Sequence, residues 1–467
     1  MANKKTEVLW VETIKGVGAR AARKNLYHIK GSDTSRGSSP VAIVGGYWVR
    51  GDDGGGVFCW DTSSHTGDNG GTIIVPIGST TGRWKRIYDE LYVDHFGTKA
   101  DGSDDSGAIN RAITAVGNGG KLGFRDKAYT AQSPILAENL RGITLIGASG
   151  QYGFNGSRII GSHTGKAILS LVGTLFASVE NIILEGDTAN RPKTGLLLGR
   201  STAASAGDHV FINLKVQGFY SIAGVYNVAS EGNDWYGCVI QPNAAPFAGM
   251  YMSQADWPIG VIGGLVGSSM EQNNFYGGEI GNGDTTPGSA GLFLDCGGST
   301  GHHHFYSTFF TEGGGDSFIF IRLGLVDGLD TTFPIGFHDC FGEGNATNGL
   351  HLSASNNTSW RLAGFTARNL RFQSPLTNNI LCDDGVYLVA PEISTPWMAP
   401  ANKPSTFSRV DGGSLSLLAE SAITINQLRG SSLTTNVKPT ITTSIGNVIR
   451  DLEGSVYSIP QPLTSWP

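Results

Sequence analysis

The chain has 467 residues, of which 68 are glycine and 15% are charged, and its formal net charge is −6. It lacks both the charge excess of disordered chains and the clustered Lys and Arg that bind phosphates, which excludes nucleic acid as the main ligand. No apolar run is long enough to cross a bilayer, and none follows the N-terminal lysines as in a secretory signal, so we expect cytoplasmic synthesis and no membrane insertion.

Residues 1–90 form the first expected unit. The basic segment "LWVETIKGVGARAARK" (9–24) predicts either an amphipathic helix or a solvated tail. The segments "DDGGGVFCWDTSS", "DNGGTIIVP" and "GRWKRIYDE" then predict a compact β module, joined to the main body at Tyr92.

The next element is one of few clear helical patterns in the chain. Ala108, Ile109, Ala112 and Ile113 recur at helical spacing behind candidate N-cap residues, which predicts a helix over about 104–116. The strand segment "GGKLGFRDKAYT" follows directly. Because the open end of a β solenoid exposes apolar side chains and unpaired strand edges, we expect this helix to cap the first rung of one.

From residue 205 the sequence repeats a phrase of two parts. The first parts are rich in aromatic residues and read "FINLKVQG", "WYGCVIQP", "FYGGEIGN", "FYSTFFTE" and "FHDCFGEG". The second parts place small residues before alternating apolar positions and read "AGVYN", "AGMYM", "AGLFL", "SFIFI" and "NGLHL". Repeats of a few tens of residues indicate solenoids or propellers.

Alternation with a period of two assigns the faces of these strands. In the second parts we expect one inward column of Val225, Met250, Leu292, Phe318 and Leu350, and a second of Met252, Leu294, Phe320 and Leu352. The residues between them would face outward, namely Tyr226, Tyr251, Phe293, Ile319 and His351. One column per repeat is what stacked parallel strands about 4.8 Å apart give, so we predict an all-β, right-handed, single-stranded parallel β-helix over residues 91–396, with propeller blades as the weaker alternative.

The proline-rich segment "PEISTPWMAPANKPSTF" predicts a boundary near residue 396. The segment that follows, 397–467, is too small to hold much core alone. We therefore expect a β-rich C-terminal module that serves in trimerisation or forms the tip.

The helix-entry segment carries an ordered set of residues: Phe96, Gly97, Lys99, Asp101, Gly102, Asp104, Asp105, Ala108, Ile109 and Gly120. This set resembles the helix-entry segment of bacteriophage tailspikes, capsule depolymerases of the pectate-lyase-like superfamily, although Ala100 stands where a glycine is usual. The resemblance implies a homotrimeric virion protein without a cofactor, attached by its N-terminus to a phage tail or baseplate protein. It also implies that the protein binds, and often cleaves, a capsular, exo- or O-antigen polysaccharide at the host surface.

The matching segment carries no catalytic group, so the candidate catalytic residues have to come from the outward positions of the repeats. In the first parts, one outward column holds Lys215, Val239, Glu279, Phe309 and Phe341, and the next holds Gln217, Gln241, Gly281, Thr311 and Glu343. Aromatic rings can stack on sugar rings, and two carboxyl groups on neighbouring rungs suit glycoside hydrolysis. We predict Glu279, Glu312 and Glu343 as catalytic acids beside Phe309 and Phe341, against the simpler interpretation that any β-helix scatters acids over its outside.

A second candidate patch places Glu231 and Asp234 beside outward-facing Tyr226 and Tyr251 as substrate-binding residues. The G-N-D turn alone also explains Asp234.

Two other functions remain open from the sequence. A spike that binds polysaccharide without cleaving it would use the same aromatic residues. A β-eliminating lyase would need a base near a cation, for which His304, Tyr306 and Arg322 are the candidates. We expect no metal site, because the consecutive histidines of "GHHHFYST" point in different directions and have no acid at ligand spacing.

Overall fold

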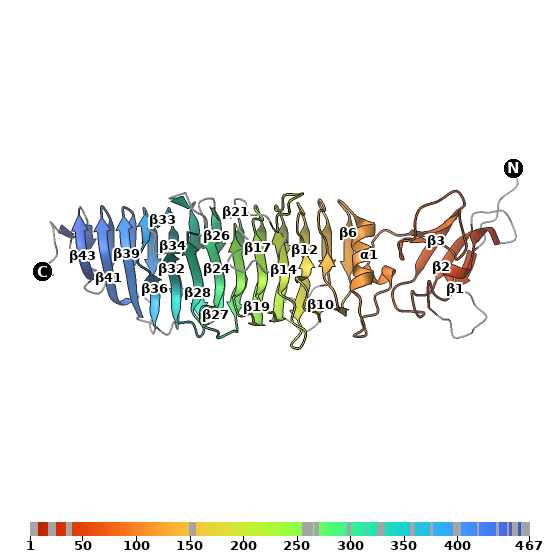
Figure 1. The fold of residues 1–467 in the computed structure, drawn as a ribbon, viewed down its shortest axis with the longest axis horizontal. Helices are drawn as coiled ribbons and strands as arrows, with labels where there is room; N and C mark the ends of the chain where they lie inside the picture. The colour runs from red at the N-terminus through yellow and green to blue at the C-terminus, as the bar shows by residue number, and fades with distance from the viewer. Residues whose placement is uncertain are drawn as a thin grey trace.

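The structure is a computed structural model. It describes residues 8–16, 25–33, 40–148, 156–254, 265, 270–296, 300–313, 315–324, 331–332, 334–354, 360–373, 377–395, 403–417, 420–435, 439–445, 448–450 and 456–458. The molecule is a rod that the chain traverses once, with an N-terminal module at one end and stacked strands along the rest (Figure 1).

The N-terminal module is a small mixed sheet with the order β1-β2-β3-β5-β4. Its elements are β1 (Val8–Val11), η1 (Leu26–His28), η2 (Gly31–Asp33), β2 (Val41–Val44), β3 (Gly56–Asp61), β4 (Ile73–Ile74) and β5 (Arg83–Ile87). Trp60 and Trp84 pack edge to face in its core, with ring centroids 5.3 Å apart. The prediction of an amphipathic helix over residues 9–24 is wrong at the start of that range, because Val8–Val11 is a strand that pairs in parallel with Val41–Val44.

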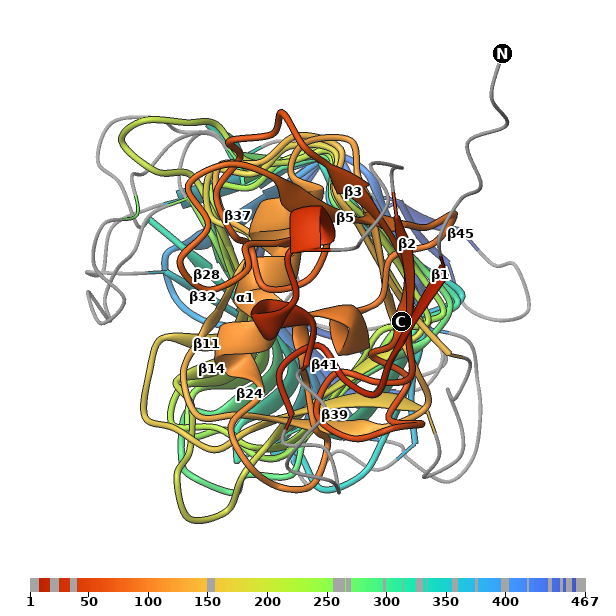
Figure 2. The ribbon, with the colours of Figure 1, turned by 90° about the vertical axis from the view of Figure 1, so that its right-hand side faces the viewer.

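The helix α1 (Ser106–Val116) lies across the end of the stacked strands, next to η3 (Val93–Phe96) (Figure 2). Its predicted apolar face is buried. Two aspartates fix its entry: Asp104 accepts hydrogen bonds from the backbone N–H groups of Ser106 and Gln132, and the buried Asp105 accepts them from Lys99, Ala100 and Thr130. The predicted cap is confirmed.

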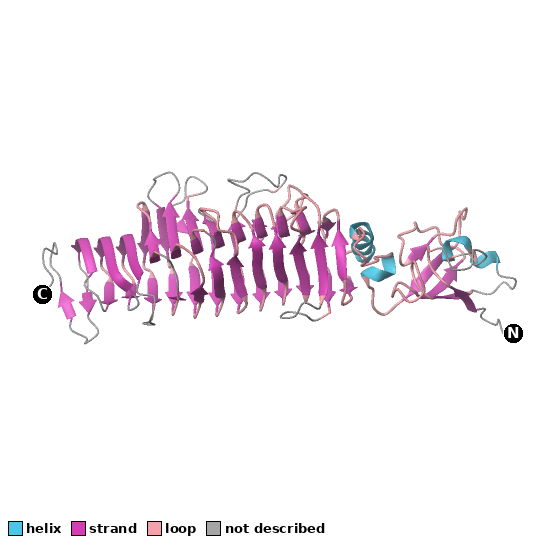
Figure 3. Cartoon of the chain, turned by 90° about the horizontal axis from the view of Figure 1, so that it is seen from below, coloured by secondary structure: helices cyan, strands magenta, loops and turns pink. Residues whose placement is uncertain are grey.

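The described strands beyond α1 form three long sheets, and the rungs from β6 to β28 each contribute one strand to each sheet. Among the described residues, the second of these sheets ends at β35, whereas the other two continue toward the C-terminus. We name them sheets I, II and III in the order in which a rung visits them. Figure 3 shows the strands stacked side by side along the rod.

Sheet I contains β6 (Lys121–Phe124), β9 (Thr144–Gly147), β12 (Ser178–Glu180), β15 (Val210–Ile212), β18 (Asp234–Tyr236), β22 (Asn274–Tyr276), β26 (His303–Tyr306), β30 (Ile335–His338), β34 (Thr366–Arg368), β38 (Glu392–Thr395), β40 (Ser414–Leu417), β42 (Ser432–Thr435), β44 (Val448–Arg450) and β45 (Val456–Ser458). Sheet II contains β7 (Ala128–Ala131), β10 (Ser157–Gly161), β13 (Ile182–Gly186), β16 (Lys215–Phe219), β19 (Val239–Ala244), β23 (Glu279–Asn282), β27 (Phe309–Gly313), β31 (Phe341–Glu343) and β35 (Arg371–Phe372).

Sheet III contains β8 (Ile135–Leu136), β11 (Ala167–Ser170), β14 (Thr194–Gly199), β17 (Ala223–Val228), β20 (Ala248–Ser253), β24 (Ala290–Cys296), β28 (Ser317–Leu323), β29 (Thr331–Thr332), β32 (Asn348–Ala354), β33 (Trp360–Ala363), β36 (Asn378–Cys382), β37 (Val386–Val389), β39 (Lys403–Asp411), β41 (Glu420–Arg429) and β43 (Pro439–Ile445). A short parallel pair, β21 (Met270–Glu271) and β25 (Thr300–Gly301), lies outside these sheets. Successive rungs pair in parallel within each sheet, with the terminal β44–β45 pair of sheet I antiparallel, so the predicted parallel β-helix is confirmed and the propeller is excluded.

The corner between sheets I and II explains why particular residue types recur at one position of each rung. Its first residue has a positive φ in rung after rung, and the residues there are Asn181, Asn213, Gly237, Gly277, Ser307, Asp339 and Asn369. Glycine, asparagine and aspartate tolerate this left-handed conformation better than other residues. Each rung therefore turns sharply, and the side chains just before and just after the corner both point to the outside.

A continuous apolar core fills the solenoid. On sheet I the inward aromatic rings stack from rung to rung, with centroids 4.0 Å apart for Phe211 and Trp235, 5.2 Å for Trp235 and Phe275, and 4.7 Å for Phe275 and Phe305. All four side chains are buried. The aromatic residue that leads each first part is thus a core residue.

The predicted columns of sheet III need one correction. Leu292 pairs with Ile319 and Leu294 with Ile321, so Phe318 and Phe320 do not belong to the two inward columns. Phe320 takes the outward position beside Phe293, with ring centroids 4.6 Å apart.

Strand pairing continues past the boundary that the sequence predicts near residue 396. β39 pairs in parallel with β36 and β37, and β40 pairs with β38. The described part of 397–467 therefore extends sheets I and III. No helix among the described residues is long and apolar enough to cross a membrane.

Candidate functional site

Two of the three predicted acids, Glu279 and Glu343, lie on the outer face of sheet II. Glu279, Phe309 and Phe341 are direct neighbours across β23, β27 and β31. Thr311 and Glu343 are direct neighbours in the second column. The structure therefore confirms the predicted register and brings two of the three acids and both phenylalanines onto one face, which we call the acid strip.

The side chains of the acid strip are held in place by contacts with neighbouring side chains. Phe309 and Phe341 stack with centroids 5.2 Å apart and ring planes 3° apart, and both are half-buried. The hydroxyl of Thr311 donates a hydrogen bond of 2.7 Å to Oε1 of Glu279, and Nε2 of Gln241 lies 3.3 Å from that hydroxyl. Glu343 is exposed. The strip thus offers one positioned carboxyl group, one solvent-facing carboxyl group and an apolar surface beside them.

The third predicted acid, Glu312, belongs to β27, but its side chain lies outside the described residues. The backbone register shifts at this point, because Gly281 pairs with Thr311 whereas Asn282 pairs with Gly313. Such an irregularity re-aims side chains and is common next to active sites.

The predicted patch of Tyr226, Tyr251, Glu231 and Asp234 does not form. Tyr226 and Tyr251 are fully buried, with ring centroids 4.8 Å apart, beneath a second apolar cluster on the outside of sheet III that includes Phe247 and Phe293. Asp234 instead lies on sheet I, where its Oδ1 accepts a hydrogen bond from Nδ2 of Asn274. The expectation that these tyrosines are exposed is wrong, because chain segments outside the solenoid cover them.

Sequence reasoning missed an exposed column on sheet I. Tyr236, Tyr276 and Tyr306 are neighbours in β18, β22 and β26, and they are 40%, 39% and 37% exposed. The sequence repeats contain a signal that predicts this column, because each of these tyrosines directly follows the aromatic residue that leads a first part. Because alternation buries that leading residue, the next one must face outward.

The three residues considered for a lyase, His304, Tyr306 and Arg322, do not lie on the same face of the solenoid. His304 and Tyr306 lie on sheet I, whereas Arg322 lies on β28 of sheet III. Nε of Arg322 donates to Oδ1 of the buried Asp295 at 2.9 Å, and Nη2 contacts Oδ2 of the same carboxylate. Arg322 therefore neutralises a buried acid instead of facing the other two residues.

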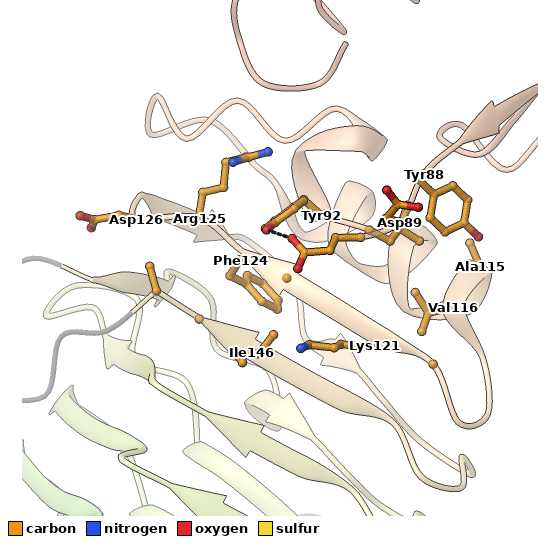
Figure 4. Close-up of a pocket in the computed structure, with 16 residues that line it drawn as sticks. Tyr88, Asp89, Tyr92, Ala115, Val116, Lys121, Phe124, Arg125, Asp126 and Ile146 are labelled. Carbon is orange, nitrogen blue, oxygen red and sulfur yellow. Dashed lines mark hydrogen bonds between the residues drawn. The ribbon is translucent and has the colours of Figure 1, made fainter. Parts of the chain in front are cut away.

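A pocket of about 530 Å³ lies at the junction of the two units (Figure 4). Residues 88–92 of the linker form one wall and strands β6 and β9 the other, with Val116 of α1 at the side. The guanidinium of Arg125 lies 4.1 Å from the ring centroid of Tyr92. The pocket belongs to the first two rungs and contains none of the predicted site residues.

A charged cluster lies on the outer face of sheet III. Nδ1 of His351 is 3.0 Å from Oδ2 of Asp316, and its Nε2 is 3.0 Å from Oδ2 of Asp383. Burial by itself lowers the pKa of His351, but the hydrogen bonds to the two aspartates outweigh it and raise the pKa from 6.5 to about 9. The imidazolium therefore bridges two carboxylates at neutral pH.

We expect the His351→Gln variant to be less stable than the wild type, by an amount that depends on pH. Because the folded pKa is raised, the stabilisation is complete below pH 6.5 and is lost as the pH rises through about 9. A shift of this size corresponds to about 3 kcal/mol. Thermal unfolding between pH 6 and 10 should show the two melting curves converging with rising pH, whereas variant His65→Gln, at an exposed position, should follow the wild type throughout. A gap that does not change with pH would contradict the bridge.

The comparisons with known proteins agree with this architecture. Residues 34–89 match the phage tail protein small four-stranded beta-sheet domain. No curated protein matches the sequence. The tailspike gp42 of Acinetobacter phage vb_AbaP_AS12 superposes with a TM-score of 0.56 at 13% identity, over 99% of this chain and 78% of that one.

A second solved structure is the tailspike protein gp49 of Acinetobacter baumannii bacteriophage Fri1, a capsular polysaccharide depolymerase. It superposes with a TM-score of 0.54 at 12% identity, over 93% of this chain and 74% of that one. At this identity the likeness establishes the fold. The chain therefore joins a domain of the phage tail β-sheet family, at residues 34–89, to a parallel β-helix of the kind found in phage tailspikes.

Proposed function

We propose that this protein is a phage tail spike that recognises a bacterial surface polysaccharide and hydrolyses it on the outer face of sheet II. The observation that carries the proposal is the acid strip, in which Glu279 adjoins the stacked Phe309 and Phe341, and Glu343 lies two residues beyond Phe341 on β31. The phage tail domain at residues 34–89 supports the location on the virion, and the fold shared with tailspikes supports the substrate class.

Hydrolysis of a glycosidic bond needs one carboxyl group to protonate the leaving oxygen and a second to activate water or to attack the sugar. The hydroxyl of Thr311 holds one oxygen of Glu279, which leaves its other oxygen to act. Glu343 faces solvent in the outward column next to that of the phenylalanines. We assign these two carboxyl groups as the catalytic pair, with Phe309 and Phe341 as the surface under the sugar.

The strand order predicts the stereochemistry. Glu279 and Glu343 lie two strands apart and are offset by two residues along the strand, so their backbones are at least about 10 Å apart. This separation favours the wide carboxyl spacing of inverting enzymes, roughly 6.5 to 9.5 Å, over the spacing of retaining ones. Retaining enzymes need carboxyl groups about 5 to 5.5 Å apart, a spacing that residues on adjacent strands can reach, and Glu312 belongs to the intervening strand β27. We expect inversion in the first product, as read by proton NMR of the anomeric signal during cleavage. Retention would instead assign the second carboxyl group to Glu312.

The N-terminal unit, residues 1–90, is proposed to attach the spike to a phage tail or baseplate protein. Trp10 on β1 is 79% exposed and Val8 is 49% exposed, and β1 is an edge strand of the module. An exposed edge with apolar side chains suits pairing with another protein. We propose that the working form is a homotrimer, in which 397–467 serves in trimerisation or forms the tip.

A spike that binds without cleaving is the second candidate, because the aromatic rings of the acid strip suit binding whether or not the acids react. The test is to incubate the purified protein with surface polysaccharides of candidate hosts and to follow chain length, new reducing ends and ultraviolet absorbance. Shorter chains with reducing ends and no absorbance support hydrolysis, and absorbance indicates an unsaturated lyase product. Binding without shortening supports the second candidate, and neither binding nor shortening on the true host's polysaccharide rejects both.

A further inference from the structure

The outer face of sheet I carries a second surface that the acid strip does not include. Tyr236, Tyr276 and Tyr306 stack with centroids 4.9 Å and 5.4 Å apart and ring planes within 9° of each other. His338 continues the stack, 4.8 Å from Tyr306. We call these four side chains the tyrosine ladder.

A polar row runs beside the ladder on the same strands, two residues earlier in each. It consists of Asp234, Asn274 and His304, which are half-buried. The following position is Gly336, where a Cβ atom would lie 2.6 Å from Nδ1 of His304 and 2.6 Å from Nε2 of His338. The absence of a side chain at Gly336 therefore makes room for both imidazoles at the end of the ladder.

The ladder has little charge. Phenol and amide groups are neutral, and burial lowers the pKa of His304 and of His338, so both imidazoles are neutral at physiological pH. Arg368, the next residue along the column, is paired by two hydrogen bonds of 2.7 Å with Glu392. The surface is thus a row of neutral hydrogen-bonding groups at regular spacing, with Asp234 at one end.

The ladder and the acid strip meet at one corner. Tyr276 ends β22 and Glu279 begins β23, with only Gly277 and Gly278 between them, both at positive φ. A ligand on the ladder would therefore lie directly beside Glu279. A second copy of this chain docked on the ladder would cover the approach to the same acid, which argues against that occupant.

We propose that the tyrosine ladder is a binding track for an extended, uncharged stretch of polysaccharide that runs parallel to the rod, with one sugar residue on each rung. One pyranose residue of an extended glycan is about as long as one rung, so each sugar meets the same phenol edge and the same polar neighbour. This inference rests on the proposed function, because it supplies the glycan that the acid strip cleaves.

The test removes the three phenol hydroxyls and keeps the rings, in the variant Tyr236→Phe/Tyr276→Phe/Tyr306→Phe. Loss of three neutral hydrogen bonds should weaken equilibrium binding of the host polysaccharide about tenfold or more, with little change in kcat. Wild-type affinity should be nearly the same at low and high salt, because the track is uncharged. Variant Tyr88→Phe is the matched control, since its ring is 49% exposed at the junction, away from the ladder, and it should bind as the wild type does.

Unchanged affinity in the triple variant would overturn the track, as would affinity that falls steeply with salt. A change of oligomeric state in the triple variant would overturn it too, by showing that the ladder is a contact between copies. These failures are distinct from failure of the proposed function, which would appear as a wild-type protein that leaves the polysaccharide uncut, whether or not it binds it.

Discussion

Replacing Glu279 or Glu343 by glutamine is expected to lower kcat for polysaccharide cleavage by about 10² to 10⁴-fold while binding is retained. Glutamine keeps the size of the side chain but can neither donate the proton nor take one up, and general acid or base catalysis contributes about this factor. The measurement is the rate of appearance of reducing ends, together with equilibrium binding of the uncut polysaccharide to each variant.

Glu185→Gln is the matched control for this pair. Glu185 lies on β13 of the same sheet, in the same column as Gln217 and Gln241, but rungs away from the phenylalanines. It accepts hydrogen bonds from Arg158 and Gln217, so its role is accounted for by local contacts. We expect full activity in this variant. Full activity in both Glu279→Gln and Glu343→Gln would remove the acid strip from catalysis.

The largest expected effect on stability follows from truncating the stacked core of sheet I. Trp235→Ala should lower the free energy of unfolding by about 3 to 5 kcal/mol, because it removes a fully buried indole and leaves a cavity. Phe211 and Phe275, which stack on either face of Trp235, would each lose a partner. Chemical or thermal unfolding followed by circular dichroism measures the loss.

The neighbouring residue supplies the control for this prediction. Tyr236→Ala changes an aromatic residue on the same strand, but on the outer face, where the ring is 40% exposed. We expect a loss well below that of Trp235→Ala. Equal losses at the two positions would contradict the assignment of inner and outer faces on which both surfaces depend.

The inner and outer faces of the first parts could be predicted from the sequence because alternation is a local property. Glu279, Phe309 and Phe341 occupy one column in the sequence pattern and are paired in the structure. The capping helix could be predicted equally well, because its apolar spacing and its two aspartates lie within a short segment.

Burial of the outward residues on sheet III could not be predicted in this way. Alternation states on which side of a strand Tyr226 and Tyr251 lie, but not whether another part of the chain covers that side. Phe247, just before β20, packs against Tyr251 with ring centroids 5.0 Å apart, and the hydroxyl of Tyr251 donates to Asp295 on β24, the neighbouring strand of the next rung. The junction pocket is similar, because its walls come from residues 88–92 and 146–148.

The most direct test of the account is to locate a bound oligosaccharide. The Glu279→Gln/Glu343→Gln variant should be crystallised with fragments of the polysaccharide that the wild type cleaves. We predict sugar density on the outer faces of sheets I and II, along Tyr236, Tyr276 and Tyr306 and over Phe309 and Phe341. Density on sheet III, or in the pocket at Tyr92, with none at this corner would contradict the account.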